Sequence, residues 1–242
     1  MDDRKSVIAD LVARQPAEPA GTAGLLRRVC RAAAKALSAS GTGLSVMTED
    51  GVRAATAASD PISERIEDLQ FVLGEGPCMD AFASRRPVLV PDLDELGCGA
   101  GSRWPFYAPA ARRDGLRAVF AFPLQVGAAR LGVMDVFRER AGPLSGEELA
   151  DALDFAEVTV AALLDQQEDT GRGGVPAVDD GDDIGLRSEL FQAQGMVMVQ
   201  LEVSLVEAMA RIRAYAYAED RHLADVARDI VARRLSFDRD IT

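Results

Sequence analysis

The segment from residue 168 to residue 183 divides this chain of 242 residues into two regions of different pattern. It reads EDTGRGGVPAVDDGDD, which is acidic, rich in glycine and without an apolar period. A segment of this kind cannot bury an apolar face, so it predicts a solvated linker. We therefore expect two folded regions, residues 22–167 and 184–242, preceded by a flexible leader over residues 1–21.

The region 184–242 is expected to be helical throughout. No glycine or proline follows Gly195, so the residues that usually interrupt helices are absent. Apolar residues recur at helical spacing in three stretches, which predicts helices starting near Ile184, Ser204 and Asp220. Ser204 followed by Glu207 has the spacing of a capping box. An all-α unit of three helices is the simplest interpretation.

The region 22–167 mixes both kinds of element. Its pattern predicts a helix from Thr22, two strands around an Asp50-Gly51 turn, further helices and a strand, two more strands, and a long helix. Pro77 suits the first position of a helix over residues 77–84. The chain therefore combines an α/β region with an all-α region.

The last helix of this region begins at a capping box formed by Ser145 and Glu148. Behind the capping box, apolar residues follow one another in steps of three and four, from Leu149 through Leu153 to Leu164. This spacing is typical of a coiled-coil seam. We expect the helix to pack on the sheet and also to pair with a second copy, giving a homodimer that Leu153→Glu would weaken.

Composition limits the classes of function. No apolar run is long enough to span a membrane, and the N-terminus has no apolar secretion signal. The three cysteines match no zinc-binding spacing and cannot all pair within the chain, which favours a cytoplasmic protein. The net charge is -12, so the chain repels nucleic acids at long range. Any binding of nucleic acid must use a local patch.

Three segments of the C-terminal region resemble the ANTAR domain family: residues 191–198 (FQAQGMVM), 207–216 (EAMARIRAYA) and 221–227 (RHLADVA). They stand in the order and spacing of that family over about residues 186–236. The resemblance implies a three-helix domain that binds RNA stem-loops and prevents transcription termination, usually as a dimer. One departure is Gln194, where the family often has lysine.

Such a domain would read the unstacked bases of RNA loops, which offer edges for hydrogen bonds and faces for stacking. Glutamines suit base edges, arginines suit phosphates or guanine edges, and tyrosine suits stacking. The expected RNA-binding residues are Gln192, Gln194, Arg211, Arg213, Tyr215, Arg221, His222 and Arg228. Each arginine can instead belong to a solvated helix face with acidic partners, and Tyr215 can be a packing residue.

Five strings in the N-terminal region resemble the GAF domains that precede ANTAR in actinobacteria. They are residues 73–78 (LGEGPC), 88–93 (VLVPDL), 103–105 (RWP), 119–124 (VFAFPL) and 132–135 (GVMD). The resemblance spans about residues 22–167 and implies an α+β sensor domain, an antiparallel sheet flanked by helices. It does not identify the ligand, because GAF domains share a fold more than a function.

A ligand pocket is expected between the sheet and the long connection over residues 74–117. Its expected lining is Phe71, Cys78, Met79, Trp104, Phe106 and Phe120. Each of these side chains can also be plain core. Cys78 follows Pro77 at a helix start, where a thiolate is stabilised, so it is also a candidate redox or metal sensor. A buried structural cysteine is the alternative.

We find no pattern for catalysis. His222 is the single histidine, and it lies in the helical tail among arginines, away from any paired nucleophile. The Gly74-Glu75-Gly76 turn lacks the lysine of a phosphate-binding loop. We therefore expect no enzyme activity, no cofactor and no metal. The expected partners are RNA stem-loops, an unknown small molecule or upstream signalling protein at the sensor, and a second copy. The alternatives are a DNA-binding regulator and a protein-interaction or dimerisation module.

Overall fold

The computed structural model describes residues 2–18, 21–47, 53–96, 103–169, 181–219, 221 and 223–237. The chain forms two compact units, one containing residues 1–71 and 75–179 and the other containing chiefly residues 180–242. We call them the sheet unit and the helical unit. The expected Asp50-Gly51 turn and most of the expected linker lie outside the described residues, as do Cys98 and His222. Within the described part, each helix is too short or too polar to cross a bilayer.

The sheet unit is built around a five-stranded sheet with the strand order β2-β1-β5-β4-β3, in which neighbouring strands are antiparallel. This confirms the expected α+β class. The elements in chain order are α1 (Asp2–Ala13), α2 (Thr22–Ala36), β1 (Gly41–Met47), β2 (Arg53–Ala58), α3 (Pro61–Leu73), α4 (Pro77–Ser84), β3 (Val88–Val90), the 3-10 helix η1 (Leu93–Leu96), α5 (Tyr107–Arg113), β4 (Ala118–Val126), β5 (Ala129–Arg138) and α6 (Gly146–Asp169).

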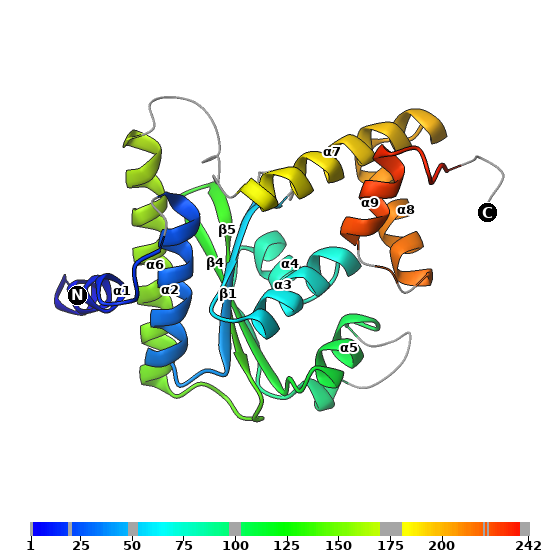
Figure 1. Ribbon diagram of the computed structural model, residues 1–242. Coiled ribbons are helices and arrows are strands. Elements are labelled where there is room, and N and C mark those ends of the chain that lie inside the picture. The colour runs from blue at the N-terminus through cyan, green and yellow to red at the C-terminus, as the bar shows by residue number, and fades with distance from the viewer. Residues whose placement is uncertain are drawn as a thin grey trace. The chain divides into compact units, whose positions relative to one another are not determined.

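Helices cover both faces of the sheet (Figure 1). Helices α2 and α6 lie on one face, and α3, α4 and α5 lie on the other. Because side chains alternate along a strand, β4 sends Phe120 and Phe122 toward α2 and α6, where they join the main apolar core. In β5, Met134 and Val136 belong to the same core, so Asp135 between them points to the opposite face.

The structure differs from the flexible leader that the sequence predicts. Residues 2–13 form helix α1, which packs on α2 and α6. Ile8 and Val12 are 4% and 6% exposed, so they belong to the core. On the polar side, Arg4 forms an ion pair with Asp151 on α6. The short apolar stripe of α1 is stable because the neighbouring helices cover it.

Helix α6 begins at the predicted capping box, which is confirmed. The Ser145 backbone N–H donates to Glu148 Oε2 over 2.7 Å, and the Glu148 N–H donates to Ser145 Oγ over 3.1 Å. The apolar seam behind this start is mostly covered within the chain. Ala156 and Leu163 are buried against the sheet and neighbouring helices, whereas Leu153 is 43% exposed. The 3-4 spacing therefore reflects packing inside the sheet unit.

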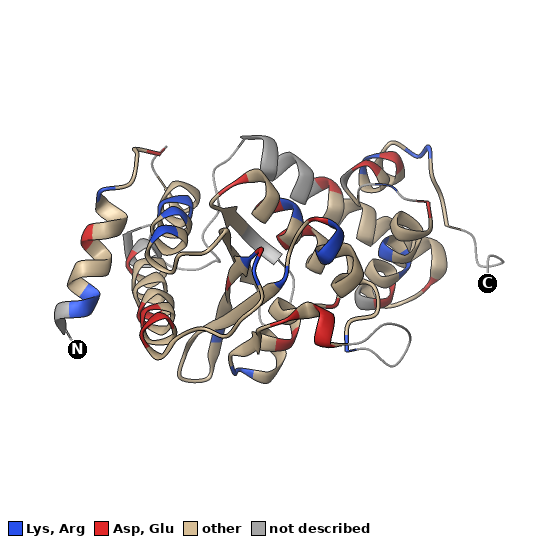
Figure 2. Ribbon diagram, turned by 90° about the horizontal axis from the view of Figure 1, so that it is seen from below, with Lys and Arg blue, Asp and Glu red and all other residues tan. Residues whose placement is uncertain are grey.

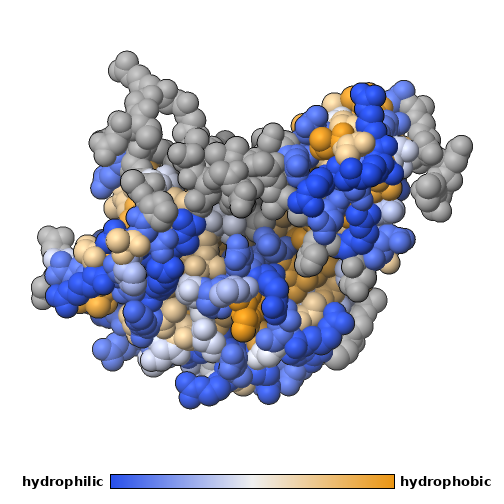
Figure 3. Space-filling view, in the orientation of Figure 1, coloured by the Kyte–Doolittle hydropathy of each residue, from blue (hydrophilic) through white to orange (hydrophobic). Residues whose placement is uncertain are grey.

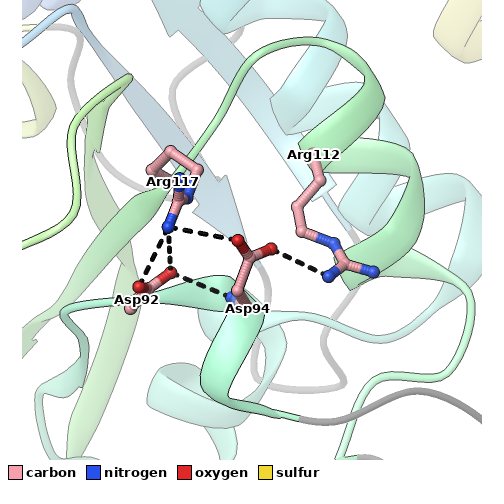
Figure 4. Close-up of polar contacts among 4 residues, drawn as sticks. All are labelled: Asp92, Asp94, Arg112 and Arg117. Carbon is pink, nitrogen blue, oxygen red and sulfur yellow. Dashed lines mark hydrogen bonds and ion pairs between the residues drawn. The ribbon is translucent and has the colours of Figure 1, made fainter.

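A network of charges fixes the connection after β3 (Figure 4). Arg117 Nη2 donates to both carboxylate oxygens of Asp92, at 3.1 and 3.0 Å, and lies 3.1 Å from Asp94 Oδ2. Arg112 on α5 donates to Asp94 Oδ1 over 2.9 Å. The network ties η1 to the start of β4 and to α5. It holds α5 in place over the sheet face that carries Asp135.

The helical unit consists of α7 (Gly181–Leu201), α8 (Leu205–Ala218) and α9 (Leu223–Val231). All three predicted helices are present. Their small core contains Ala193 and Val197 of α7, Ile212 of α8, and Val226 and Ile230 of α9, each fully buried. The predicted cap at the start of α8 is also present, because the Glu207 N–H donates to Ser204 Oγ over 3.2 Å.

Candidate functional sites

A buried polar cluster lies on the sheet face that α3, α4 and α5 cover. It contains Glu67 of α3, Cys78 of α4 and Asp135 of β5. One carboxylate or thiol atom from each lies within 4.8 Å of the other two. All three residues are at most 2% exposed. The fold therefore brings together two carboxylates and a thiol from three segments far apart in the sequence.

Neighbouring side chains orient the members of this cluster. Gln70 donates from Nε2 to Asp135 Oδ2 over 2.8 Å, and its Oε1 accepts the Cys78 backbone N–H at 2.8 Å. Ser45 on β1 donates from Oγ to Glu67 Oε2 over 2.7 Å. The bond from Gln70 fixes the carboxylate of Asp135, and the bond from Ser45 fixes the carboxylate of Glu67. The bond from the Cys78 N–H also fixes the start of α4. The cluster is thus held by a second layer of hydrogen bonds.

Gly43 on β1 provides the space that Glu67 occupies. A Cβ atom at this position would lie 2.1 Å from Glu67 Oε1 and 2.4 Å from its Cγ. Gly43 is paired with Asp135 across the β1–β5 ladder. The absence of a side chain on β1 therefore lets the carboxylate of Glu67 approach the carboxylate on β5.

Tyr107 lies near the cluster because the start of α5 is anchored to the residues around α4. Glu75 Oε1 accepts the backbone N–H groups of Phe106 and Tyr107 at 2.7 and 2.8 Å. Trp104 donates from Nε1 to Asp80 Oδ2 over 3.1 Å and meets the Tyr107 ring edge-on at 6.2 Å. Tyr107 is fully buried, and its hydroxyl has no hydrogen-bond partner among the described residues.

Burial changes the acidity of these groups. Desolvation raises the pKa of Asp135 to about 6, against the hydrogen bonds from Glu67, Gln70 and Cys78, which lower it. Burial also raises the pKa of Tyr107, and the charges of Asp135 and Glu67 raise it further. The phenol therefore lies within electrostatic range of both carboxylates. The site favours either bound protons or a bound cation over free negative charge.

The expected pocket residues divide into three groups. Phe71, Cys78 and Trp104 are buried, and Met79 is half-buried; these residues belong to α3, α4 and the approach to α5. Phe106 is 49% exposed, so it does not line a closed pocket. Phe120 packs in the core against α2 and α6, on the opposite face of the sheet. The expectation for Phe120 is wrong because strand alternation directs it away from Cys78.

The helical unit has a surface groove of about 590 Å³ between α7 and the residues that follow α9. Its apolar lining includes Met196, Val199 and Leu235, and Val199 is 69% exposed. Its polar lining includes Gln192 and Arg233. Arg233 is exposed and forms no ion pair with a described residue. Apolar surface appears among the hydrophilic surface of this unit in Figure 3.

Two of the expected RNA-binding residues are neighbouring glutamines of α7 with different surroundings. Gln192 is exposed and lines the groove. Gln194 is only 6% exposed, and its Nε2 donates to the Leu205 carbonyl over 2.7 Å. This bond joins α7 to the start of α8. The structure therefore gives Gln194 a role in packing the helices.

The exposed arginines of α8 and α9 have acidic partners. Arg211 lies 3.4 Å from Glu207. Arg228 donates to Asp225 over 2.7 Å and lies 3.6 Å from Glu189. Basic and acidic positions alternate along this unit in Figure 2. Between residues 184 and 237 the sequence holds seven arginines and seven acidic residues, so the unit has no bulk positive charge.

Tyr215 and Arg221 lie together beside the end of the chain. Tyr215 is half-buried and meets Phe237 edge-on at 5.5 Å. Arg221 forms an ion pair with Asp229, which also binds Arg234 at 2.7 Å. The hydrogen bond and charge of Asp229 raise the pKa of Arg221, and Tyr215 contributes a smaller effect. Arg213 on α8 is also half-buried, and His222 lies outside the described residues.

Comparison with family models identifies both units. The model of the GAF domain family matches residues 20–165, which is more than half of the chain. The chain belongs to the GAF domain family. The model of the ANTAR domain matches residues 186–231, so the helical unit is an ANTAR domain. The resemblances to the GAF and ANTAR domain families are confirmed.

One solved structure agrees on the fold of the GAF domain with a TM-score above 0.5. A GAF domain of a phosphoenolpyruvate-protein phosphotransferase from Coxiella burnetii is 18% identical, with a TM-score of 0.53 over 69% of this chain and 95% of that chain. The corresponding domain from Acinetobacter is 11% identical, with a TM-score of 0.49 over 69% and 95%. A free methionine-R-sulfoxide reductase from Neisseria meningitidis, solved with its substrate, is 19% identical, with a TM-score of 0.45 over 69% and 88%. Curated protein sequences give no match.

Sequence reasoning missed two parts of these sites. In the GAF domain it proposed Cys78 but not Glu67, Asp135 or Tyr107, whose proximity depends on the pairing of β1 with β5 and on the docking of α3 and α5. In the ANTAR domain it missed Arg233, because the arginine follows α9 and its exposure depends on how the chain end packs. The one signal in the sequence is the alternation of side chains along the strands. It places Phe120 and the two neighbours of Asp135 on one face of the sheet and Asp135 on the other.

Proposed function

We propose that this protein is a signal-responsive transcription regulator in which the GAF domain controls an ANTAR domain that binds RNA stem-loops and prevents transcription termination. The groove of the ANTAR domain, with Arg233 at its edge, is the observation that carries this proposal. The family match adds the class of partner.

The groove has the chemistry that a base from an RNA loop requires. Met196, Val199 and Leu235 offer an apolar lining for a base face, whereas Gln192 and Arg233 offer hydrogen bonds to base edges or phosphates. Arg233 forms no ion pair with a described acidic residue, so phosphate can bind it without displacing one of those carboxylates. Groove and guanidinium together match a splayed-out nucleotide better than a duplex.

Arginines that already hold a carboxylate can still take part. Each guanidinium has five N–H donors, and an ion pair uses only one or two of them. In this proposal Arg211, Arg221 and Arg228 are held by their carboxylate partners and present their remaining donors. Arg213 adds a half-buried guanidinium, and Tyr215 supplies an aromatic edge. The net charge of -12 repels RNA at long range, so recognition then depends on a preformed arrangement of these side chains.

The GAF domain supplies the input in this proposal. A small molecule or an upstream signalling protein shifts the population between two arrangements, one of which binds RNA. We retain the expectation of a homodimer from the family resemblance. Because α1, α2 and the sheet cover most of the apolar seam of α6, we propose that the contact between copies uses mainly other surface.

Crosslinking of the full chain to RNA in its native host tests the proposal. The crosslinked RNA is sequenced for the unchanged protein and for two variants, Arg233→Gln and Arg234→Gln. Both arginines are exposed, but Arg234 is tied to Asp229. We expect enrichment of stem-loop RNA, reduced about tenfold by Arg233→Gln and much less by Arg234→Gln, which matches the loss of one specific contact of about 1–3 kcal/mol.

The alternatives predict other outcomes. A protein that recovers no enriched RNA is not an RNA regulator, and a protein-interaction module then explains the ANTAR unit. Preferential recovery of duplex DNA in the same experiment supports the DNA-binding regulator. Equal effects of the two variants contradict the role of the groove, because they would mean that Arg233 contributes only its positive charge and makes no specific contact.

A further inference from the structure

The buried cluster in the GAF domain has a donor set suited to a metal ion. Glu67 and Asp135 provide carboxylate oxygens and Cys78 provides sulfur, and the three donor atoms lie within 4.8 Å of one another. Bonds of about 2.0–2.3 Å to zinc place tetrahedral ligands about 3.5 Å apart. If the three donor atoms moved about 1 Å closer together, all three could bond to one metal ion. Side-chain rotation can produce a movement of this size.

The electrostatics of the cluster also favour a cation. Two carboxylates and a thiol share a volume from which water is excluded, since all three residues are at most 2% exposed. Buried negative charges of this kind are stable only when they are protonated or bound to a cation. No arginine or lysine is among the groups that shift the pKa of Asp135, which are Glu67, Gln70 and Cys78.

The surroundings are those of a supported metal site. Gln70 and Ser45 hold the two carboxylates, with hydrogen bonds of 2.8 and 2.7 Å. Gly43 leaves the room that Glu67 needs. Residues that orient metal ligands are a regular part of metal sites, because they fix the direction of the donor atoms.

Tyr107 is an independent observation that points to a ligand. Its hydroxyl is fully buried and bonds to no described residue, and the charges of Asp135, Glu67 and Cys78 act on it. Buried polar groups are almost always hydrogen-bonded, so an unsatisfied hydroxyl in a protein interior needs a partner. A water bound to a metal in the fourth coordination position would be such a partner.

We propose that Glu67, Cys78 and Asp135 bind one divalent transition-metal ion of the class of Zn²⁺ and Fe²⁺, with the Tyr107 hydroxyl bonded to a water on the metal. The thiolate selects these ions over Mg²⁺ and Ca²⁺, which prefer oxygen ligands only. Binding releases the thiol proton to solvent, because the thiolate is the ligand. The inference concerns the GAF domain alone and does not depend on RNA binding.

Metal binding to the full chain tests this proposal. The protein is stripped with a chelator and then titrated with Zn²⁺, and with Co²⁺ as a spectroscopic probe. We expect one equivalent to bind, a thiolate-to-cobalt charge-transfer absorption, and a rise in melting temperature with Zn²⁺. Cys78→Ser and Asp135→Asn should each weaken Zn²⁺ binding at least tenfold and remove the rise in melting temperature.

Cys30→Ser is the matched control, because Cys30 is another buried thiol, on α2, whose Sγ lies 3.5 Å from the Ala57 carbonyl oxygen. It should bind Zn²⁺ like the unchanged protein. Undiminished binding by Cys78→Ser, or weak binding of several ions without a cobalt–thiolate band, overturns the proposal. If a variant fails to fold, the cobalt spectrum of the unchanged protein still decides, since its lack of the band would exclude a thiolate ligand.

Discussion

Gln70 donates a hydrogen bond to Asp135 over 2.8 Å, and this contact links the middle of α3 to a strand 65 residues away. The other end of the same amide accepts the backbone N–H of Cys78, so one side chain sets the positions of two members of the buried cluster. The amide is suited to this task because it offers a donor and an acceptor at once.

Gln70→Leu should destabilise the GAF domain by about 3 kcal/mol, because it leaves the Asp135 carboxylate and the Cys78 N–H buried without their partners. Urea denaturation followed by the fluorescence of Trp104, the single tryptophan, measures this change. Gln125→Leu is the control, since Gln125 is exposed and its contact with the Arg85 carbonyl is 3.5 Å long. Equal stability of the two variants would show that the bridge contributes little.

Asp60→Asn should lower stability by about 1 kcal/mol at pH 7, because it removes the negative charge at the start of α3 and the Oδ2 atom that accepts the Ser59 and Ser63 hydroxyls. Burial opposes ionisation of Asp60, but hydrogen bonds from Ser59, Ser63 and Ile62 outweigh it and lower its pKa below 3.8. The unfolded chain therefore takes up the proton first as the pH falls.

This stabilisation is complete above pH 3.8 and is lost as the pH falls through the lowered pKa of the folded state. The difference between Asp60→Asn and the unchanged protein should accordingly shrink toward zero below that range. Urea denaturation at pH 7 and at several acidic values checks this, with the exposed Glu139→Gln as a control. A difference that grows on acidification would contradict the assigned direction.

Ile8→Ala should cost about 3 kcal/mol, as expected for a large apolar side chain removed from a core, because Ile8 is only 4% exposed. Val7→Ala should cost almost nothing, since Val7 is 54% exposed on the same helix. Chemical denaturation of both variants measures the difference. Two small and equal effects would mean that α1 does not contribute to the core in solution.

Gln194→Ala should raise the hydrogen exchange of the first turns of α8 about tenfold, because the variant loses the bond to the Leu205 carbonyl. Gln192→Ala should leave exchange unchanged, since Gln192 is exposed. Mass spectrometry of peptides from residues 205–218 distinguishes the two. If Gln194→Ala keeps native exchange but loses RNA, the side chain reaches RNA as the sequence predicts.

Local signals in the sequence predict most of the elements. The helix over residues 77–84 has the expected bounds, because Pro77 and its flanking glycine determine where it starts. The serine caps of α6 and α8 both lie where the serine and glutamate spacing places them. Helix α1 was not predicted, since its few apolar residues gain stability only after α2 and α6 cover them.

The sites could be predicted only in part, because they depend on contacts between distant segments. Cys78 stands out beside a proline, but Glu67 and Asp135 resemble any other acidic residues until the sheet is assembled. Gln192 and Gln194 are indistinguishable in sequence, and a helical rotation of 200° between them makes one a surface residue and the other a buried one. Only the packing of α7 decides which is which.

Asp229 binds Arg221 before α9 and Arg234 after it. Two guanidinium groups around one carboxylate carry a surplus of one positive charge at a single point, in a chain whose total is -12. Asp229 offsets one of the two positive charges and also holds both arginines in place. Neutralising Asp229 would therefore raise the local positive charge and at the same time release both arginines. A polyanion would gain attraction but lose the fixed geometry, so tighter binding there should come with poorer selectivity.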